Sequence, residues 1–258
     1  MTYRKAHETA PVLLALLIPG AASGRLSSEP PPQAVAGYQA YIDSVEARLA
    51  AQHRTAVGFL SSTGPVRMDG GEPIVERLTP AGADPPGAQI HHWRGTAFVP
   101  GAKAKDFERL LMDFEHYSKN FAPQVLEARI LARDGDRVQA WMRVRERRGL
   151  TVTLDATYDV TFRQLDAAHG FSTSRSVRIT QIEPTGDAFD GLLWRQNTYW
   201  SWEERDSGLT IEIESVSLTR SIPRGLGWVI GPFVERVPRE ELEFTLRSAC
   251  SALRRVKQ

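Results

Sequence analysis

Three short turn sequences divide residues 126 to 217 into runs of alternating apolar and polar residues, and this feature constrains the fold most strongly. The segments RDGDR (133–137) and RRG (147–149) each offer a glycine where a three-residue turn needs a left-handed residue, and Ser207-Gly208 marks a third turn. Successive side chains of a strand point to opposite faces, so the position of each turn determines which residues share a face. The pattern predicts an antiparallel sheet.

The first two turns align one uniformly apolar face. A turn at 134–136 predicts the pairs Ala132 with Val138, Ile130 with Ala140, Ala128 with Met142 and Leu126 with Val144. A turn centred on 147–149 predicts the pairs Val144 with Val152, Met142 with Leu154, Ala140 with Ala156 and Val138 with Tyr158. We expect this face to lie against the rest of the protein and the opposite, polar face to be solvated.

The last predicted hairpin carries Trp194, Trp200 and Trp202, whose even numbers place them on one face of a strand. A turn at Ser207-Gly208 predicts the pairs Trp202 with Ile213, Trp200 with Ser215 and Thr198 with Ser217. The inner face then also carries five polar side chains, namely Arg175, Gln196, Thr198, Ser215 and Ser217. A dry core rarely accepts so many polar groups without partners, so the pattern favours a cavity.

Helical periodicity appears on both sides of the strands. Apolar residues recur at helical spacing up to about His53, at Val35, Tyr38, Ile42, Val45 and Leu49, and a long helical pattern begins near Gly225. We divide the chain into residues 1–24 as a signal peptide, 25–33 as a Pro-rich linker, 34–89 as an N-terminal helix with a connecting arm, and 90–258 as the main domain.

The N-terminus has the order of a secretory signal peptide. Arg4 and Lys5 precede the apolar run VLLALLI (12–18), and small residues follow at 21–24. The run is much shorter than the roughly 20 apolar residues that span a bilayer. We expect export to the periplasm or the medium, and an uncleaved tail is the alternative interpretation.

Composition limits the partners and the covalent cross-links that we expect. The formal net charge is +1 and no long run of one sign occurs, so we expect no nucleic-acid partner. The single cysteine, Cys250, excludes an internal disulfide. Hydrophobic residues make up 41% of the chain, which is enough for a sizeable core.

Three segments resemble the START-like superfamily, also called SRPBCC. The segment DFERLLMDFEHYSKNFAPQVLEARIL resembles its early helical bend and second strand, YWSWEERDSGLTIEIE its penultimate strand and turn, and VPREELEFTLRSACSALRRV its gripping helix. The resemblance covers about residues 90 to 256 and implies an α+β helix-grip fold, with a curved antiparallel sheet around a long C-terminal helix. The superfamily includes lipid-transfer domains and aromatase/cyclases, and its members hold ligands in a tunnel between sheet and helix.

No motif for catalysis, a cofactor or a metal stands out. His91 and His92 are neighbours in a predicted strand and therefore point to opposite faces. The chain has no G-x-S-x-G elbow and no glycine-rich phosphate loop. Arg175 near Tyr158 is the most chemical pair that the pattern offers, and Arg175 paired with an acidic neighbour such as Asp155 or Glu183 is the alternative.

We therefore expect an exported protein that binds a hydrophobic or amphipathic, lipid-like small molecule without a cofactor, and an enzyme of the cyclase or aromatase type is the alternative. Trp228 and Phe233 lie in a glycine-broken apolar segment that suits either a lid in transient contact with a membrane or simple packing onto the sheet. The predicted ligand-binding residues are Met142, Tyr158, Arg175, Trp194, Gln196, Thr198, Trp200, Ser215, Ser217, Trp228 and Phe233. We assign no catalytic residue and no metal ligand.

Overall fold

The computed structural model describes residues 29–61, 71–148, 150–182, 188–189, 193–205, 207–221 and 227–255. For residues 146–148, 150–151 and 227–236 it describes the backbone alone. The predicted signal peptide and Gly149 lie outside the described residues. No helix in the described ranges is both long enough and apolar enough to cross a membrane.

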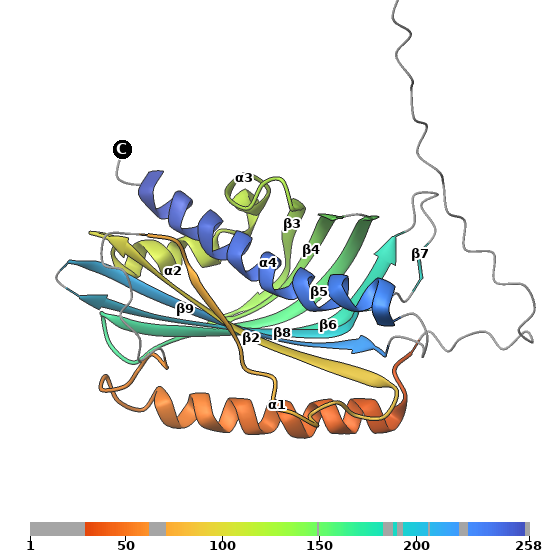
Figure 1. Ribbon diagram of the computed structural model, residues 1–258. Coiled ribbons are helices and arrows are strands. Elements are labelled where there is room, and N and C mark those ends of the chain that lie inside the picture. The colour runs from red at the N-terminus through yellow and green to blue at the C-terminus, as the bar shows by residue number, and fades with distance from the viewer. Residues whose placement is uncertain are drawn as a thin grey trace, which may run out of the picture.

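A curved antiparallel sheet forms the centre of the molecule (Figure 1). Its path runs β1-β2-β9-β8-β6-β5-β4-β3. In chain order these strands are β1 (Ile74–Arg77), β2 (Ala88–Pro100), β3 (Val125–Asp134), β4 (Arg137–Arg148), β5 (Leu150–Gln164), β6 (His169–Ile182), β8 (Leu193–Arg205) and β9 (Gly208–Arg220), and the short β7 (Ala188–Phe189) pairs with β6. Strand β1, at one edge of the sheet, lies within the predicted connecting arm.

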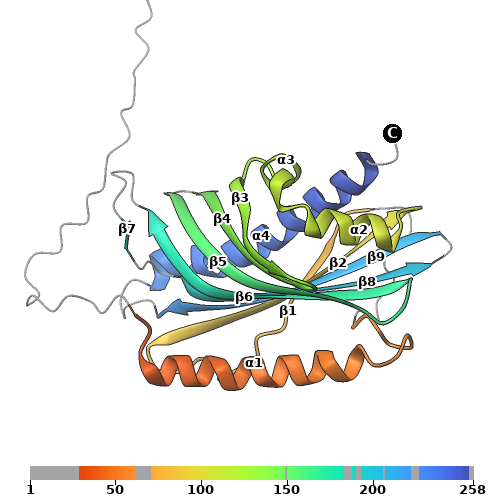
Figure 2. The same cartoon turned by 180° about the vertical axis from the view of Figure 1, so that it is seen from behind.

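Helices lie on both faces of the sheet (Figures 1 and 2). Helix α4 (Gly227–Arg255) crosses one face together with α2 (Ala104–Met112), the 3-10 turn η1 (Phe114–His116) and α3 (Tyr117–Asn120). Helix α1 (Pro32–Gln52) covers the other face. We call the face toward α4 the inner face and the face toward α1 the outer face. The predicted α+β architecture, a curved sheet against a long C-terminal helix with an N-terminal helical extension, is confirmed.

Helix α1 buries the apolar stripe that the periodicity predicts. Tyr38, Ile42, Val45 and Leu49 are buried on the outer face, where they pack against Trp194, Tyr199, Val216 and Leu218. Val35 is only partly buried, and Ala34 takes the buried position instead. The helix starts at Pro32, where the missing N–H and fixed φ of proline suit the first helical turn.

The main core lies between the inner face and the C-terminal half of α4. Leu242, Leu246 and Leu253 are buried there with Trp200 and Trp202. Helix α4 approaches β2 closely at Gly95, where a Cβ atom would lie 2.4 Å from Leu246 Cδ1 and 3.2 Å from Leu242 Cδ2. Glycine at this position therefore allows the helix to lie directly on the strand.

Most of the predicted strand pairs have the correct faces, but several have the wrong register, and Ala132 pairs with Gln139 on the outer face. Ile130 pairs with Ala140 and Ala128 with Met142, as predicted, around a turn in which Gly135 has φ 57°. Bulges on either side of these pairs oppose Val125 to Val144 and Arg133 to Val138, in place of the predicted partners Leu126 and Ala132.

Two later hairpins are displaced by two residues. Met142 pairs with Ala156 rather than Leu154, and Ala140 with Tyr158 rather than Ala156. Trp202 pairs with Ile211 and Trp200 with Ile213. A two-residue shift leaves each side chain on its predicted face, because the side-chain period of a strand is two.

Candidate ligand-binding site

The inner face of the sheet changes from apolar to polar at the middle of β2 and β9. The rows that contain Trp202 and Trp200 cross to Ile211 and Ile213, and these four side chains are buried in the main core. The next rows, toward the start of α4, are polar. One row contains Trp93, Ser215, Thr198 and Ser174, and the adjacent row contains His91, Ser217 and Gln196, with Tyr158 beyond them on β5.

Gln196 is the central side chain of this polar half. Its Oε1 accepts a hydrogen bond of 3.1 Å from the Tyr158 hydroxyl, and its Nε2 lies 3.5 Å from Ser215 Oγ and 3.4 Å from Glu241 Oε1 of α4. The backbone N–H of Gln196 donates to Ser176 Oγ at 2.9 Å. Burial, followed by the nearby Glu241 charge, raises the pKa of Tyr158 well above its usual value, so its hydroxyl stays protonated and donates.

Two buried polar atoms of β2 have no hydrogen-bond partner among the described residues. They are the Trp93 indole Nε1 and the Gln89 side-chain Oε1. Both residues lie in register with inner-face residues of β9, Ser215 for Trp93 and Thr219 for Gln89. His91, between them, has its Nε2 3.0 Å from Thr219 Oγ1. An unpaired buried donor or acceptor costs about 1 to 3 kcal/mol, so this part of the face is suited to a bound group.

Apolar side chains lie beside the polar half, toward the same end of the sheet. Met142 and Leu154 on β4 and β5, with Leu193 on β8, are only partly buried, although they pack against the main core. Gln196, Thr198 and Ser215 are also only partly buried. An incompletely covered surface with an apolar side and a polar side suits an amphipathic molecule.

Two residues predicted for the cavity lie on the outer face instead. Arg175 forms a bidentate ion pair with Glu46 of α1, with N–O distances of 2.7 and 2.6 Å. Trp194 is buried against α1, and the Arg220 guanidinium lies 5.2 Å from its ring centroid. The predictions for Arg175 near Tyr158 and for Trp194 facing the C-terminal helix are therefore wrong.

Beta-bulges explain both errors. In β8 the register shifts between Leu193 and Arg195, so Trp194 is on the opposite face from Gln196, Trp200 and Trp202. In β6 the register shifts near Val177, so Tyr158 pairs with Ser176 while Arg175 pairs with Asp159 of the polar outer face. A simple alternation rule cannot detect the extra residue of a bulge.

The other predicted site residues fall into three groups. Tyr158, Gln196 and Ser215 come together, and Met142, Thr198 and Ser217 share their face. Trp200 shares the face as well, but it is buried in the apolar half, 5.3 Å from the Phe107 ring of α2 between ring centroids. Trp228 and Phe233 lie on α4 where side chains are outside the described part of the chain.

Comparisons with known proteins found similar solved structures at low sequence identity. No protein-family model and no curated protein matches the chain. Similar solved structures include a START superfamily protein from Mycobacterium smegmatis, with 18% identity over 64% of this chain and 98% of that chain (TM-score 0.45). A STAR-related lipid transfer protein from Xanthomonas axonopodis has 17% identity over 70% and 98% (0.45). The Zhui aromatase/cyclase from Streptomyces sp. R1128 has 18% identity over 66% and 97% (0.44).

The chain has a helix-grip fold, in which a curved antiparallel sheet lies against a long C-terminal helix. This statement rests on the order of its elements and on the sheet-and-helix arrangement described above. At these identities and TM-scores the similar structures support no conclusion about this chain. They do not transfer the ligands or reactions of those proteins to the side chains of this site.

Sequence reasoning missed four residues of the helix-grip interior. Gln89, His91 and Trp93 occupy alternate positions of β2 and therefore share the inner face, and that alternation was visible in the sequence. His92 lies on the outer face, as the alternation of neighbours predicts. Glu241 of α4 carried no signal, because the rotation of a helix about its axis depends on which side chains pack.

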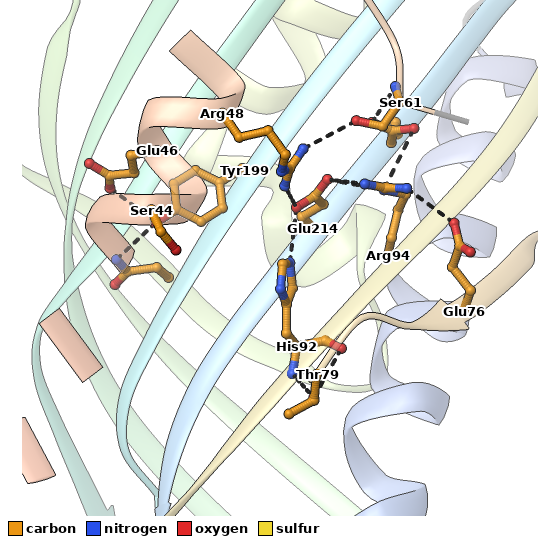
Figure 3. A network of polar contacts seen from close by, with 12 residues as sticks. Ser44, Glu46, Arg48, Ser61, Glu76, Thr79, His92, Arg94, Tyr199 and Glu214 are labelled. Carbon is orange, nitrogen blue, oxygen red and sulfur yellow. Dashed lines mark hydrogen bonds and ion pairs between the residues drawn. The ribbon is translucent and has the colours of Figure 1, made fainter. Parts of the chain in front are cut away.

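A buried ionic cluster on the outer face is the second candidate site (Figure 3). Glu214 accepts hydrogen bonds from His92 Nε2 at 2.9 Å and Arg94 Nε at 3.0 Å, and it also pairs with Arg48 of α1. Burial would raise the pKa of Glu214, but the His92 hydrogen bond and the Arg48 and Arg94 charges lower it to about 2. Glu214 is only 1% exposed, and each contact joins α1 or β2 to β9, so the cluster holds α1 on the sheet.

A cleft of about 540 Å³ lies at the opposite end of the sheet from the polar half. Its lining includes His53, Met112, Phe162 and Phe171 and contains none of the predicted ligand-binding residues. Within the described ranges, no group of His, Cys, Asp and Glu side chains is arranged to hold a metal ion. Cys250 is buried in the main core, and burial raises the pKa of its thiol to about 11, which makes it a poor nucleophile.

Proposed function

We propose that this protein binds a hydrophobic or amphipathic small molecule between the inner face of its sheet and helix α4. One observation carries the proposal: the inner face turns polar beneath α4 while staying incompletely covered, beside the partly buried Met142 and Leu154. If this face served only as a hydrophobic core, we would expect apolar side chains to continue along it beyond the rows of Trp200 and Trp202. The buried Trp93 Nε1, which has no hydrogen-bond partner in the part of the chain that the structure describes, supports a ligand at this place.

Saturable binding of Nile red, an uncharged fluorescent dye of apolar sites, tests this proposal. We expect the wild-type protein to enhance its fluorescence with a definite stoichiometry. Thr198 lies on the inner face in the row of Trp93, so Thr198→Phe should fill the space and weaken binding by about tenfold or more. Thr157→Phe is the matched control, because Thr157 pairs with Trp141 on the outer face.

Two results would refute the proposed site. Absence of saturable dye binding by the folded wild-type protein would remove the binding function. Equal binding by the wild type and Thr198→Phe, with a weaker Thr157→Phe variant, would place the dye on the outer face. Thermal melts of both variants confirm that each is folded, since overpacking a strand position costs about 1 to 3 kcal/mol.

A cyclase- or aromatase-type enzyme is the second candidate function. Tyr158 and Glu241 both contact Gln196, so a hydroxyl donor and a carboxylate lie close together there. The raised pKa of Tyr158 makes its hydroxyl a weak acid, which favours binding over proton transfer. Mass spectrometry of a polyketide-like ligand after incubation separates the two functions, because a binder returns it unchanged whereas a cyclase releases a dehydrated product.

We also propose that the protein is exported after removal of residues 1–24, on the charged, apolar and small-residue order of that segment. Intact-mass measurement of protein recovered from the cell envelope or medium is the test. A soluble cytoplasmic species that retains Met1 to Gly24 would contradict export.

A further inference from the structure

Helix α1 covers only part of the outer face. Its buried stripe packs against β2, β8 and β9, through residues such as Ile90, Tyr199 and Val216. Strands β3, β4 and β5 curve away from α1 toward the side of α4 (Figures 1 and 2). The described outer-face side chains of these three strands are all exposed or only partly buried. We call them, together with Val177 and Arg178 of β6, the open outer face.

Arginines are spread across the open outer face by the strand registers. One row across β3, β4, β5 and β6 consists of Arg129, Trp141, Thr157 and Arg178. The row therefore has a cation at each end and an aromatic ring between them. Arg143 and Arg145 follow Trp141 on the same face of β4, at the next alternate positions. Cations of β3, β4 and β6 therefore share this face.

The carboxylates of the open outer face lie opposite arginines or accept a hydrogen bond. Arg143 donates to both carboxylate oxygens of Asp155, at 2.7 and 2.8 Å. Asp159 accepts a hydrogen bond of 2.9 Å from Gln139 Nε2. The strand registers place Glu127 opposite Arg143 and Asp134 opposite Arg137. These negative charges therefore have local partners on the same face.

Other cations of this face have no carboxylate partner of their own. Arg129 and Arg178 are exposed and Arg145 is partly buried, and no described side chain forms an ion pair with any of them. The Trp141 ring helps to hold two guanidinium groups in place, because Arg129 Cζ lies 4.6 Å and Arg143 Cζ 5.4 Å from its centroid. The open outer face therefore presents an excess of positive charge to solvent.

Apolar side chains lie among these cations. Trp141 is only partly buried. Leu131 and Val177 are the extra residues of the bulges in β3 and β6, and they are 47% and 49% exposed. Tryptophan and arginine beside aliphatic side chains are typical of surfaces that meet the boundary between lipid and water. A hydrophilic polyanion such as a nucleic acid would pair with the charges but leave the aliphatic side chains in water.

We propose that the open outer face docks onto a membrane surface rich in anionic phospholipids. The arginines contact the lipid phosphates, and Trp141, Leu131 and Val177 reach the level of the head groups. The proposal does not depend on the small-molecule function. Because Trp141 and Met142 are neighbours on one strand, they point to opposite faces, and docking leaves the inner face free of the membrane.

Sedimentation of the full chain with lipid vesicles tests the proposal. One set of vesicles contains phosphatidylcholine alone, and the other contains phosphatidylcholine and phosphatidylglycerol in equimolar amounts. We expect about tenfold tighter binding to the anionic vesicles, and added salt should weaken it. Arg129→Gln combined with Arg178→Gln should reduce this binding about twentyfold, because each arginine at an anionic surface contributes a factor of about five.

A second double variant and two tryptophan variants locate the contact. Arg109→Gln combined with Arg239→Gln removes the same charge from exposed positions on α2 and α4, and it should change binding less than about threefold. Brominated phosphatidylcholine quenches tryptophans that lie near the acyl chains, so it should quench the wild type but quench Trp141→Phe much less. Trp228→Phe, in the apolar segment at the start of α4, should be quenched like the wild type.

Several results would overturn docking through this face. Equal binding to the two kinds of vesicle, or equal losses in the two double variants, would do so. Loss of quenching in Trp228→Phe but not in Trp141→Phe would place the contact at α4 instead. Binding to soluble polyphosphate without binding to vesicles would replace the membrane by a soluble polyanion. Thermal melts show whether each variant is folded, and Nile red binding without vesicles tests the proposed function separately.

Discussion

Glu214 shows how a residue of ordinary polarity becomes structurally important through its surroundings. The strand pattern predicts that Glu212 and Glu214 face outward, and both do lie on the outer face. Helix α1 and the segment after it cover that face, however, so both carboxylates are about 1% exposed. A buried carboxylate is tolerated here because Arg94, His92 and Arg48 surround it.

We predict that Glu214→Gln lowers the free energy of unfolding by about 3 to 5 kcal/mol, because the mostly buried Arg94 and the more exposed Arg48 lose their buried counter-charge. Glu76→Gln is the control, since the Glu76 carboxylate also contacts Arg94 but is half exposed. The control should change stability by no more than about 1 kcal/mol. Urea unfolding of the three proteins measures both values, and equal effects would contradict the prediction.

His53 makes the stability depend on pH. Its ring stacks on Phe171 at 4.3 Å between centroids, and its Nε2 lies 2.9 Å from Ser201 Oγ. Burial lowers the pKa of His53 from 6.5 to about 4. The unfolded chain therefore binds a proton at higher pH than the folded protein does, so this residue destabilises the fold as pH falls from about 6.5 to about 4.

We predict that lowering the pH from 7 to 5 costs the wild type about 2 kcal/mol more than it costs His53→Gln, which cannot titrate. The other titratable residues are the same in both proteins, so the difference isolates His53. Glu214, with a folded pKa near 2, adds its own loss only below about pH 4.5. Parallel pH curves for the two proteins in chemical denaturation would contradict the assignment.

At the scale of elements, α1 is an integral layer of the fold. Its stripe packs on the outer face, the Tyr38 hydroxyl donates to the Val216 carbonyl at 3.0 Å, and Glu46 and Arg48 pair with sheet residues. The outer face beneath it carries Trp194 and Tyr199, which would be exposed without the helix. Helix α1 thus has both the apolar and the charged contacts of a permanent element.

We predict that Ile42→Ala, in the centre of the α1 stripe, lowers the free energy of unfolding by about 2 to 5 kcal/mol through the cavity that it leaves. Val57→Ala is the matched control in the same N-terminal region, because Val57 is 89% exposed. That change should stay within about 0.5 kcal/mol. A similar small effect for Ile42→Ala would show that α1 is only loosely attached.

At the scale of the whole molecule, the sheet separates two hydrophobic clusters and contributes side chains to both. The inner cluster joins α2 and α4 to the sheet, and the outer cluster joins α1 to it. Strands β8 and β9 contribute side chains to both clusters, through Trp200 and Ile213 on one face and Trp194 and Val216 on the other. Loss of either layer therefore exposes apolar surface of the same strands.

We predict a single cooperative unfolding transition. Far-UV circular dichroism and tryptophan fluorescence should give the same urea midpoint. The tryptophan fluorescence of the Trp194→Phe variant reports mainly on the inner cluster. The Trp200→Phe variant keeps Trp194, which reports on the outer cluster. For each variant, the unfolding curve from fluorescence should coincide with the curve from circular dichroism. An earlier fluorescence transition in the protein that retains Trp194 would show that α1 leaves first.

The sequence by itself determined the order of elements, the faces of most strands and the apolar stripe of α1. These follow from local periodicity and turn chemistry, which a single chain displays directly. Tyr158, Gln196 and Ser215 were predicted to share a face for the same reason. Only the tertiary structure decided on which face of the sheet Arg175 and Trp194 lie. One extra residue in a bulge moves the following side chains to the opposite face, and the composition of the strand does not reveal it. The tertiary structure also decided that Glu214 is buried and that Glu241 meets Gln196, since these contacts depend on how layers distant in sequence pack together.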